Sequence, residues 1–294
     1  LVNSKAIVLR TIKYSDSTLI VDAYTEQGGR RGFLVRIPKT RKASVKNVLF
    51  SPMAILNIEW NEHGTSKLTR IKAVQPANIY SDIPFSPAKM AITMFLAEFL
   101  SASLRAPMPD RNIFNFIFTS LQWLDNEKGN CANFHIVFLV HLSTYLGLEP
   151  NIENCSETSY FDMENGCFTP FRPTTPHAIE PHEARHLPLI MRLKFTTASR
   201  IPFTRAQRTR ILQAITEYYS IHIPDFPTLK SPEILHELFP DHTFRMIFHK
   251  ILPQTQKNTL INFVGNNKCR TFALATKGMS LCLLYTSDAA DEED

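Results

Sequence analysis

RRGFLVRIPKTRKASVK, residues 30–46, joins a β-strand pattern to a basic loop. In its first half, Phe33, Val35 and Ile37 fall on one face of a strand and Arg36 falls on the other. No acid interrupts the stretch, whose cations are Arg30, Arg31, Arg36, Lys39, Arg41, Lys42 and Lys46. Lys and Arg bind a sugar-phosphate backbone by displacing its condensed counterions, so we predict a nucleic-acid contact here. A solvated charge run is the alternative interpretation.

The sequence on either side of this stretch predicts further strands. Their residues are β-branched or aromatic, and turn residues separate them, including the hairpin signal Gly28-Gly29. The five expected strands cover residues 5–11, 18–25, 31–37, 53–60 and 67–74. Five strands within about 70 residues fit a small closed barrel of the oligonucleotide-binding (OB) type.

After residue 80 the hydrophobic period becomes that of helices. Ser86-Pro87 is an N-cap followed by proline at the first helical position, Asp110 starts a second helix, and Gly147 ends a third. The expected helices cover 87–104, 111–124, 132–147, 183–195, 204–221 and 231–239, and residues 150–180 have an irregular pattern. We therefore predict an α+β protein of several domains, in which a five-stranded OB-fold barrel is followed by an all-α helical domain.

The positive charge of the chain is concentrated near its start. The net charge is +5, but residues 1–80 alone carry 13 Lys/Arg against 5 Asp/Glu, a net charge of +8. Residues 81–239 carry 13 against 16, a net charge of −3. This asymmetry indicates an anionic partner for the N-terminal domain.

The chain divides into three parts on composition and pattern. We expect an OB-fold nucleic-acid-binding domain at 1–80 and a helical domain at 81–239, with an irregular insertion at 151–182. Residues 240–294 have no clean period, and CLLYTSDAADE (282–292) looks like the translation of a sequencing adapter. We expect this last part to be a disordered, non-native read-through tail, the alternative being a genuine acidic tail.

Several function classes find little support in the sequence. No apolar run is long enough for a transmembrane helix, and neither phosphate-binding glycine motif occurs. Five cysteines at irregular spacing do not form a disulfide framework, so we expect a reducing, cytoplasmic location. The residues available for a zinc site or a nucleophile–base pair are Cys155, Cys167, His177, His182 and His186. No C-x-x-C pair and no catalytic motif surrounds them, so we expect neither a metal nor an enzyme.

A second basic stretch lies in the helical part. No acid occurs from residue 184 to residue 216, and the cations there are Arg185, Arg192, Lys194, Arg200, Arg205, Arg208 and Arg210. A solvated helix face is one interpretation of this stretch. The other is a site for an acidic peptide or for more nucleic acid, with Arg192, Lys194, Arg200, Arg205 and Arg208 as the contacts.

The barrel segment also resembles a known family. KAIVLRTIKYSDSTLIVDAYTEQGGRRGFLV (5–35), the basic loop, LFSPMAILNIEW (49–60) and the helical second part resemble the bacterial DNA repair family RecO, in a Bacteroidetes-type form. The resemblance covers about residues 1–239.

The resemblance implies a recombination mediator of the RecFOR pathway, acting in DNA damage repair at the nucleoid. Such a protein binds single- and double-stranded DNA and anneals complementary strands. With RecR it promotes loading of RecA onto single strands coated by the single-stranded DNA-binding protein SSB, whose acidic C-terminal tail it contacts. The basic strand and loop from Arg30 to Lys46 would be the DNA contacts, and the tail would suit the second basic stretch.

Besides the non-native tail, one departure from the family matters. Many relatives carry a four-cysteine zinc module between helices, but here only Cys155 falls at a plausible ligand position. Asn165-Gly166 stands where Gly-Gly usually precedes the third cysteine, leaving Thr169 and Arg172 at the last two positions. We therefore expect a degenerate zinc-finger-like insertion without zinc.

Two other hypotheses stay open at this point. One is an RNA- or single-strand-binding OB-fold protein without mediator activity, and the other is an enzyme that uses the Cys/His segment. For stacking on bases we expect exposed aromatic side chains on the barrel, with Tyr14, Tyr24 and Phe33 as candidates and burial in the core as the alternative for Phe33.

Overall fold

The computed structural model describes residues 1–36, 49–62, 68–105, 108–199 and 201–238. The cations Lys39, Arg41, Lys42 and Lys46, and also Arg200, lie outside these residues, as does the expected tail at 240–294. Within the described part, no helix is long and apolar enough to cross a membrane.

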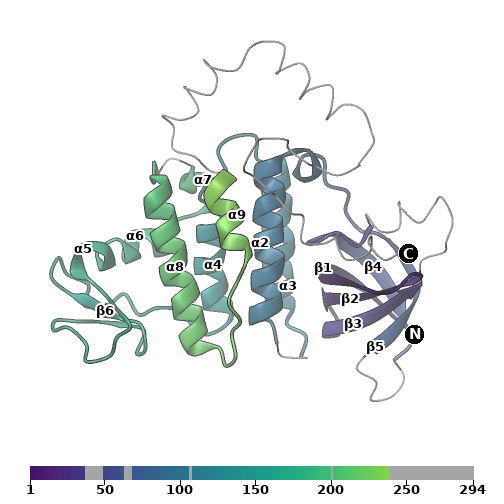
Figure 1. Cartoon of the computed structure of the whole chain (residues 1–294), viewed down its shortest axis with the longest axis horizontal. Helices are drawn as coiled ribbons and strands as arrows, with labels where there is room; N and C mark the ends of the chain where they lie inside the picture. Colours follow the sequence, from purple (N-terminus) through teal and green to yellow (C-terminus); the bar gives the residue numbers. More distant parts are fainter. Residues whose placement is uncertain (37–48, 63–67, 106–107, 200, 239–294) are drawn as a thin grey trace, which may run out of the picture. The chain divides into compact units, whose positions relative to one another are not determined.

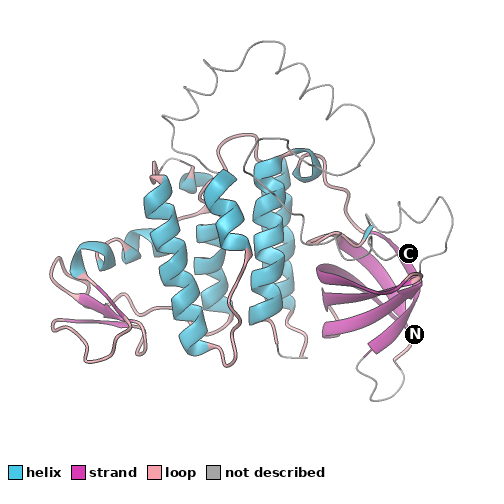
Figure 2. Cartoon of the chain, viewed as in Figure 1, coloured by secondary structure: helices cyan, strands magenta, loops and turns pink. Residues whose placement is uncertain are grey.

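The N-terminal part is a closed five-stranded barrel, as the sequence predicts (Figures 1 and 2). The order around the barrel is β1-β2-β3-β5-β4, and β4 pairs with β1 to close it. All neighbours are antiparallel except β3 and β5, which are parallel. The strands are β1 (Val2–Ser15), β2 (Thr18–Thr25), β3 (Gly29–Arg36), β4 (Ile55–Trp60) and β5 (Leu68–Pro76).

The alternation in β3 decides which side chains fill the barrel. Phe33 and Val35 point into a buried cluster, and the ring of Phe33 meets that of Trp60 edge to face at 5.5 Å. Arg36 is exposed, as the pattern predicts. Gly29 has φ +62°, which suits glycine at the β2–β3 turn. The two expected faces are therefore confirmed for Phe33, Val35 and Arg36, and Ile37 lies outside the described residues.

Long helices follow the barrel. Ser86 caps the first of them through its side chain, Asp110 caps the second, and Gly147 has φ +70° just after the third. Thr204 and Gln207 form a capping box at the start of the fourth. A short 3-10 turn, η1 (Ile83–Phe85), precedes α2 (Pro87–Ser103), α3 (Arg111–Asn126), α4 (Phe134–Tyr145), α8 (Arg205–His222) and α9 (Ser231–Leu238).

The region between α4 and α8 differs from the sequence-based expectation. Residues 150–180 are not irregular throughout, because Phe161 and Phe168 bury their rings together and their strands pair. The sheet has the order β7-β6-β8 and consists of β6 (Tyr160–Asp162), β7 (Cys167–Thr169) and β8 (Ala178–Ile179). The single helix expected at 183–195 is wrong, because proline cannot continue a helix and Pro188 instead lies in the first turn of a new one, which starts at Leu187. Three short helices result: α5 (Pro181–Ala184), α6 (Leu187–Met191) and α7 (Phe195–Ala198).

A buried carboxylate joins the end of the barrel to the helices. Asp125, in the last turn of α3, accepts hydrogen bonds from the amides of Ser81, Asp82 and Ile83 at 2.7–2.9 Å and from the Ser81 hydroxyl at 3.0 Å. Lys89 of α2 is buried beside it and pairs with Asp82 at 2.7 Å. Burial would raise the pKa of Asp125, but these hydrogen bonds outweigh it, so that the pKa lies below its ordinary value.

Candidate nucleic-acid interface

The outer surface of the barrel is divided by a β-bulge in β1. Val8 pairs with Ala23 and Arg10 pairs with Asp22, which leaves Leu9 as an extra residue. Ile7 and Leu9, before or at the bulge, pack into the same buried cluster as the helices. Beyond the bulge the outward side chains are no longer covered, and Arg10 is exposed.

The uncovered half of the barrel carries a cross-strand row of side chains. Ile12 lies opposite Ile20, Ile20 opposite Leu34, and Leu34 opposite Arg70. Residues directly opposite in a sheet share one face, so this row runs across β1, β2, β3 and β5. We call this surface the open face; it consists of Arg10, Ile12, Ile20, Leu34, Arg36 and Arg70.

The open face is positively charged and its arginines are available. The side chains of Arg10, Arg36 and Arg70 are exposed, and within the described residues they make no hydrogen bond or ion pair. Strands 2 and 3 are where OB-folds bind oligonucleotides, and β2 and β3 lie at the middle of this face. The arrangement can therefore neutralise phosphates along an extended strand.

The cations predicted at the start of the basic stretch have different surroundings. Arg30 is bound to Asp22, with Nη2 at 2.5 Å from Oδ2, and to the end of α2. Arg31 pairs with Glu62 at 2.6 Å, and its guanidinium lies 5.7 Å from the centre of the Trp60 ring. Arg36 is exposed on the open face. The loop cations are outside the described residues, so the assignment of the basic stretch 30–46 as a set of DNA contacts stays a prediction.

One of the three aromatic candidates for stacking is exposed. Tyr14 has 69% of its surface accessible, at the end of the β1–β2 hairpin. Phe33 is fully buried in the barrel core. Tyr24 is buried against the helices, and its hydroxyl donates to the carbonyl of Asp110 at 3.4 Å. The expectation that Tyr24 stacks on bases is wrong because its ring lies in the interdomain core, and for Phe33 the alternative of a core position is confirmed.

The sequence reasoning missed two arginines of the open face. Arg10 and Arg70 are isolated cations in strands, far from the basic stretch, so composition alone does not single them out. The bulge at Leu9 reverses the alternation of β1 and turns Arg10 outward. For Arg70 the sequence does hold a signal, because apolar Ile71 alternates with the cations Arg70 and Lys72 on either side of it. The pairing of β5 with β3, which places Arg70 opposite Leu34, is seen only in the structure.

The second basic stretch is split by the structure. Arg205 and Arg208, in the first turns of α8, line a cavity of about 850 Å³, whereas Arg192 and Lys194 are exposed and do not line it. Arg200 is outside the described residues. The two halves of this stretch therefore belong to different surfaces.

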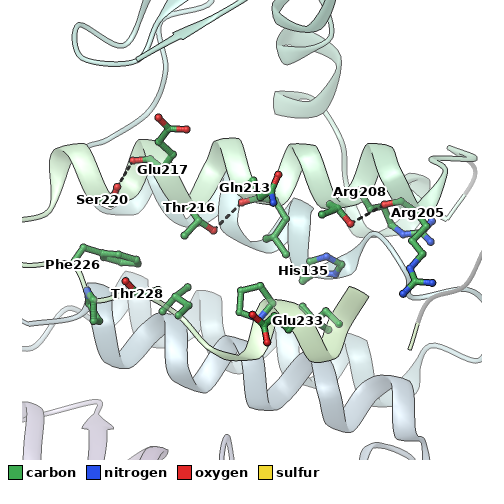
Figure 3. Close-up of a pocket in the computed structure, with 16 residues that line it drawn as sticks. His135, Arg205, Arg208, Gln213, Thr216, Glu217, Ser220, Phe226, Thr228 and Glu233 are labelled. Atoms are coloured by element: carbon green, nitrogen blue, oxygen red, sulfur yellow. Dashed lines mark hydrogen bonds between the residues drawn. The ribbon is translucent and has the colours of Figure 1, made fainter. Parts of the chain in front are cut away.

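The cavity lies between α8 and α9, with His135 of α4 at its floor (Figure 3). Arg205 and Arg208 stand at one end of it and Phe226 and Thr228 at the other. Apolar side chains line the rest, including Leu212, Leu229 and Leu235. Burial, and to a smaller extent the charge of Arg208, lowers the pKa of His135 to about 3, so the imidazole is neutral near pH 7.

The Cys/His segment does not form a ligand set. Cys167 lies in β7, and His177 pairs through Nδ1 with Glu217 of α8 at 2.7 Å. Among the residues that the structure describes, no three His, Cys, Asp or Glu side chains gather where they could hold a metal ion. Instead, Asp162 fixes the β6–β7 turn, because its carboxylate accepts from the amides of Glu164 and Asn165.

Comparisons with known proteins agree with this architecture. The family model "Recombination protein O N terminal" matches residues 1–80, and "Recombination protein O C terminal" matches residues 84–232. These limits fall next to the domain boundary that we predict after residue 80, which itself stays a prediction.

Curated relatives match about four fifths of the chain. A DNA repair protein RecO of Bacteroides fragilis is 44% identical over 234 residues, which are 79% of this chain and 97% of the relative. The corresponding proteins of Phocaeicola vulgatus and Porphyromonas gingivalis are 41% identical over 233 residues and 34% over 242. These cover 79% and 80% of this chain, and 97% and 98% of the relatives. The barrel, the helical region and these matches together confirm the predicted resemblance, and the chain belongs to the recombination protein O (RecO) family.

Proposed function

We propose that this protein is a DNA repair and recombination mediator without catalytic activity. It binds single- and double-stranded DNA, anneals complementary strands and, with RecR, promotes RecA loading onto SSB-coated single strands. It acts in the cytoplasm, at the nucleoid. The observation that carries the proposal is the open face, a basic, uncovered surface on strands 2 and 3 of an OB-like barrel in a chain of the RecO family.

DNA binding on this face does not depend on the base sequence of the strand. Arg10, Arg36 and Arg70 supply phosphate contacts, together with the loop cations Lys39, Arg41, Lys42 and Lys46. The exposed ring of Tyr14 supplies a stacking surface, which accepts any base because every base has a π-face. Annealing requires this tolerance, since a mediator must hold two strands of any complementary sequence.

The cavity beside α8 suits the acidic tail of SSB. Arg205 and Arg208 give one end a positive charge, which attracts carboxylates. The apolar walls between α8 and α9 accept hydrophobic side chains of the same peptide. Arg192 and Lys194, on the other surface, stay available for DNA.

Charge reversal in the basic loop tests the DNA assignment. The triple variant Lys39→Glu, Arg41→Glu, Lys42→Glu removes three phosphate contacts, so the slope of log K against log salt should fall by about 2 for a single strand. The control reverses three exposed cations of the helical domain, Lys128, Arg172 and Lys230, which changes the net charge equally. An unchanged slope in the loop variant would remove the loop from the DNA site.

A competition between single-stranded DNA and RNA of the same sequence tests the alternative function. The 2′-hydroxyl is the group by which a protein distinguishes RNA from DNA. Equal or better binding of DNA fits the mediator, whereas a strong preference for RNA would favour an RNA-binding OB-fold protein.

A further inference from the structure

Arg30 has no hydrogen-bond donor left for DNA. A guanidinium has five N–H groups. Nε and one N–H of Nη2 donate to the carboxylate of Asp22, and the other N–H of Nη2 reaches the Ser101 hydroxyl at 3.2 Å. Nη1 donates to the carbonyls of Ser101 and Leu104 at 2.6 and 3.1 Å. All five donors are used within the protein.

These contacts tie the barrel to the end of a helix. Ser101 and Leu104 lie at the C-terminus of α2, where carbonyl groups lack intrahelical partners and the helix dipole favours a cation. Arg30 and Asp22 are both largely covered, with 24% and 22% of their side chains exposed. The pair therefore belongs to the junction between the barrel and the helices.

Asp22 also borders the open face. It lies directly opposite Arg10 in the β1–β2 ladder, and both side chains point outward from the barrel. Side chains directly opposite in antiparallel strands are close enough to form an ion pair. Without Arg30, the carboxylate of Asp22 would attract Arg10 and compete with a phosphate for it.

We propose that Arg30 is a positioning residue of the DNA site: it holds Asp22 against the end of α2, leaves Arg10 to the phosphate, and itself contacts no DNA. This inference rests on the proposed DNA-binding function. The inference gives Arg30 a different role from Arg36, which lies on the same strand but is exposed on the open face.

A double-mutant cycle between Arg30 and Asp22 tests the inference. Arg30→Gln should lower the salt slope for a fluorescein-labelled oligo(dT) by about 0.7, because Arg10 is drawn to Asp22, and weaken binding about fourfold at ~0.15 M salt. In the Asp22→Asn background the same change should have no effect, because no carboxylate remains to compete. Arg36→Gln, as the matched control, should lower the slope by about 0.7 in both backgrounds.

Two results of this cycle would overturn the inference. If Arg30→Gln lowers the slope equally in the Asp22→Asn background, Arg30 itself contacts DNA. If Arg30→Gln matches the wild type in both backgrounds, Arg30 does not act through Asp22. A wild-type protein that shows no salt-dependent DNA binding would instead refute the proposed function before any variant is made.

Arginine labelling of the wild-type protein tests the same inference without depending on the folding of any variant. Arginine modification with p-hydroxyphenylglyoxal, read by mass spectrometry, should label Arg10 and Arg36 in the free protein and less so when oligo(dT) is bound. Arg30 should be unreactive in both states, because its guanidinium is fully bonded. Labelling of Arg30 that DNA suppresses would contradict the inference.

Discussion

The arginines of the open face should account for much of the affinity for single strands. Arg10, Arg36 and Arg70 are exposed and make no hydrogen bond or ion pair within the described residues, so each is free to neutralise one phosphate. Changing all three to Gln removes the charges and keeps side chains of similar length. Because they are surface positions, the fold should keep its stability within about 0.5 kcal/mol per site.

The expected magnitude follows from counterion release. Each lost contact lowers the salt slope by about 0.7 for a single strand, so three should lower it by about 2. At ~0.15 M salt one contact corresponds to about fourfold in affinity, and three to about 50-fold, or ~2.3 kcal/mol.

Fluorescence anisotropy of labelled oligo(dT) from 50 to 300 mM KCl measures both quantities in one titration series. The control changes Lys128, Arg172 and Lys230 to Gln, which removes the same charge from the helical domain. Equal slopes for the wild type and the open-face variant would refute the reasoning. If the open-face variant and the control lose the same affinity for DNA, the loss comes from net charge and not from contacts on the open face.

Three further outcomes follow from other parts of the structure. Tyr14→Ala should weaken oligonucleotide binding by ~1–3 kcal/mol in anisotropy titrations, whereas Tyr14→Phe should not, if the ring stacks on a base. Changing Arg205 and Arg208 to Gln should weaken binding of an SSB tail peptide about tenfold in calorimetry, and the same change at Arg192 and Lys194 should leave it intact. Asp125→Asn should lower the unfolding free energy by about 3 kcal/mol at pH 7 in urea titrations, because three amides lose a charged acceptor. The folded-state pKa of Asp125 is depressed, so its stabilisation is present above the unfolded pKa near 4 and is lost as the pH falls through the folded value.

The barrel could be predicted from the sequence because its signals are local. Alternation in β3, turn residues between strands and the Gly28-Gly29 hairpin each depend on a few neighbouring residues, and the structure follows them. The same holds for the helix starts at Ser86, Asp110 and Thr204, where the capping side chain is set by the sequence itself.

The candidate site was less predictable because it depends on contacts between distant residues. Arg30 belongs to a conspicuous run of cations, yet Asp22 and the end of α2, 71 residues away at Ser101, use all its donors. Tyr24 has the pattern of a strand residue, but whether it faces water or a helix is decided by interdomain packing. The cavity is lined by residues of α4, α8 and α9, so no single stretch of sequence indicates it.

The short helices after the small sheet show a further limit. The apolar spacing over 183–195 fits one helix, but proline at 188 ends the hydrogen-bond ladder and starts a new turn. Arg192 follows the short helix α6, and Arg208 lies in α8 beyond α7, so the two arginines belong to different elements and only Arg208 lines the cavity. A run of charge in sequence is therefore no guide to a patch in space where the backbone bends.

Annealing of complementary fluorescent strands, bare and coated with SSB, tests the central claim most directly. The full chain should anneal both, and annealing of coated strands should be lost when SSB lacks its acidic C-terminal tail. Binding of single strands without acceleration of annealing would contradict the mediator function and leave a nucleic-acid-binding barrel alone.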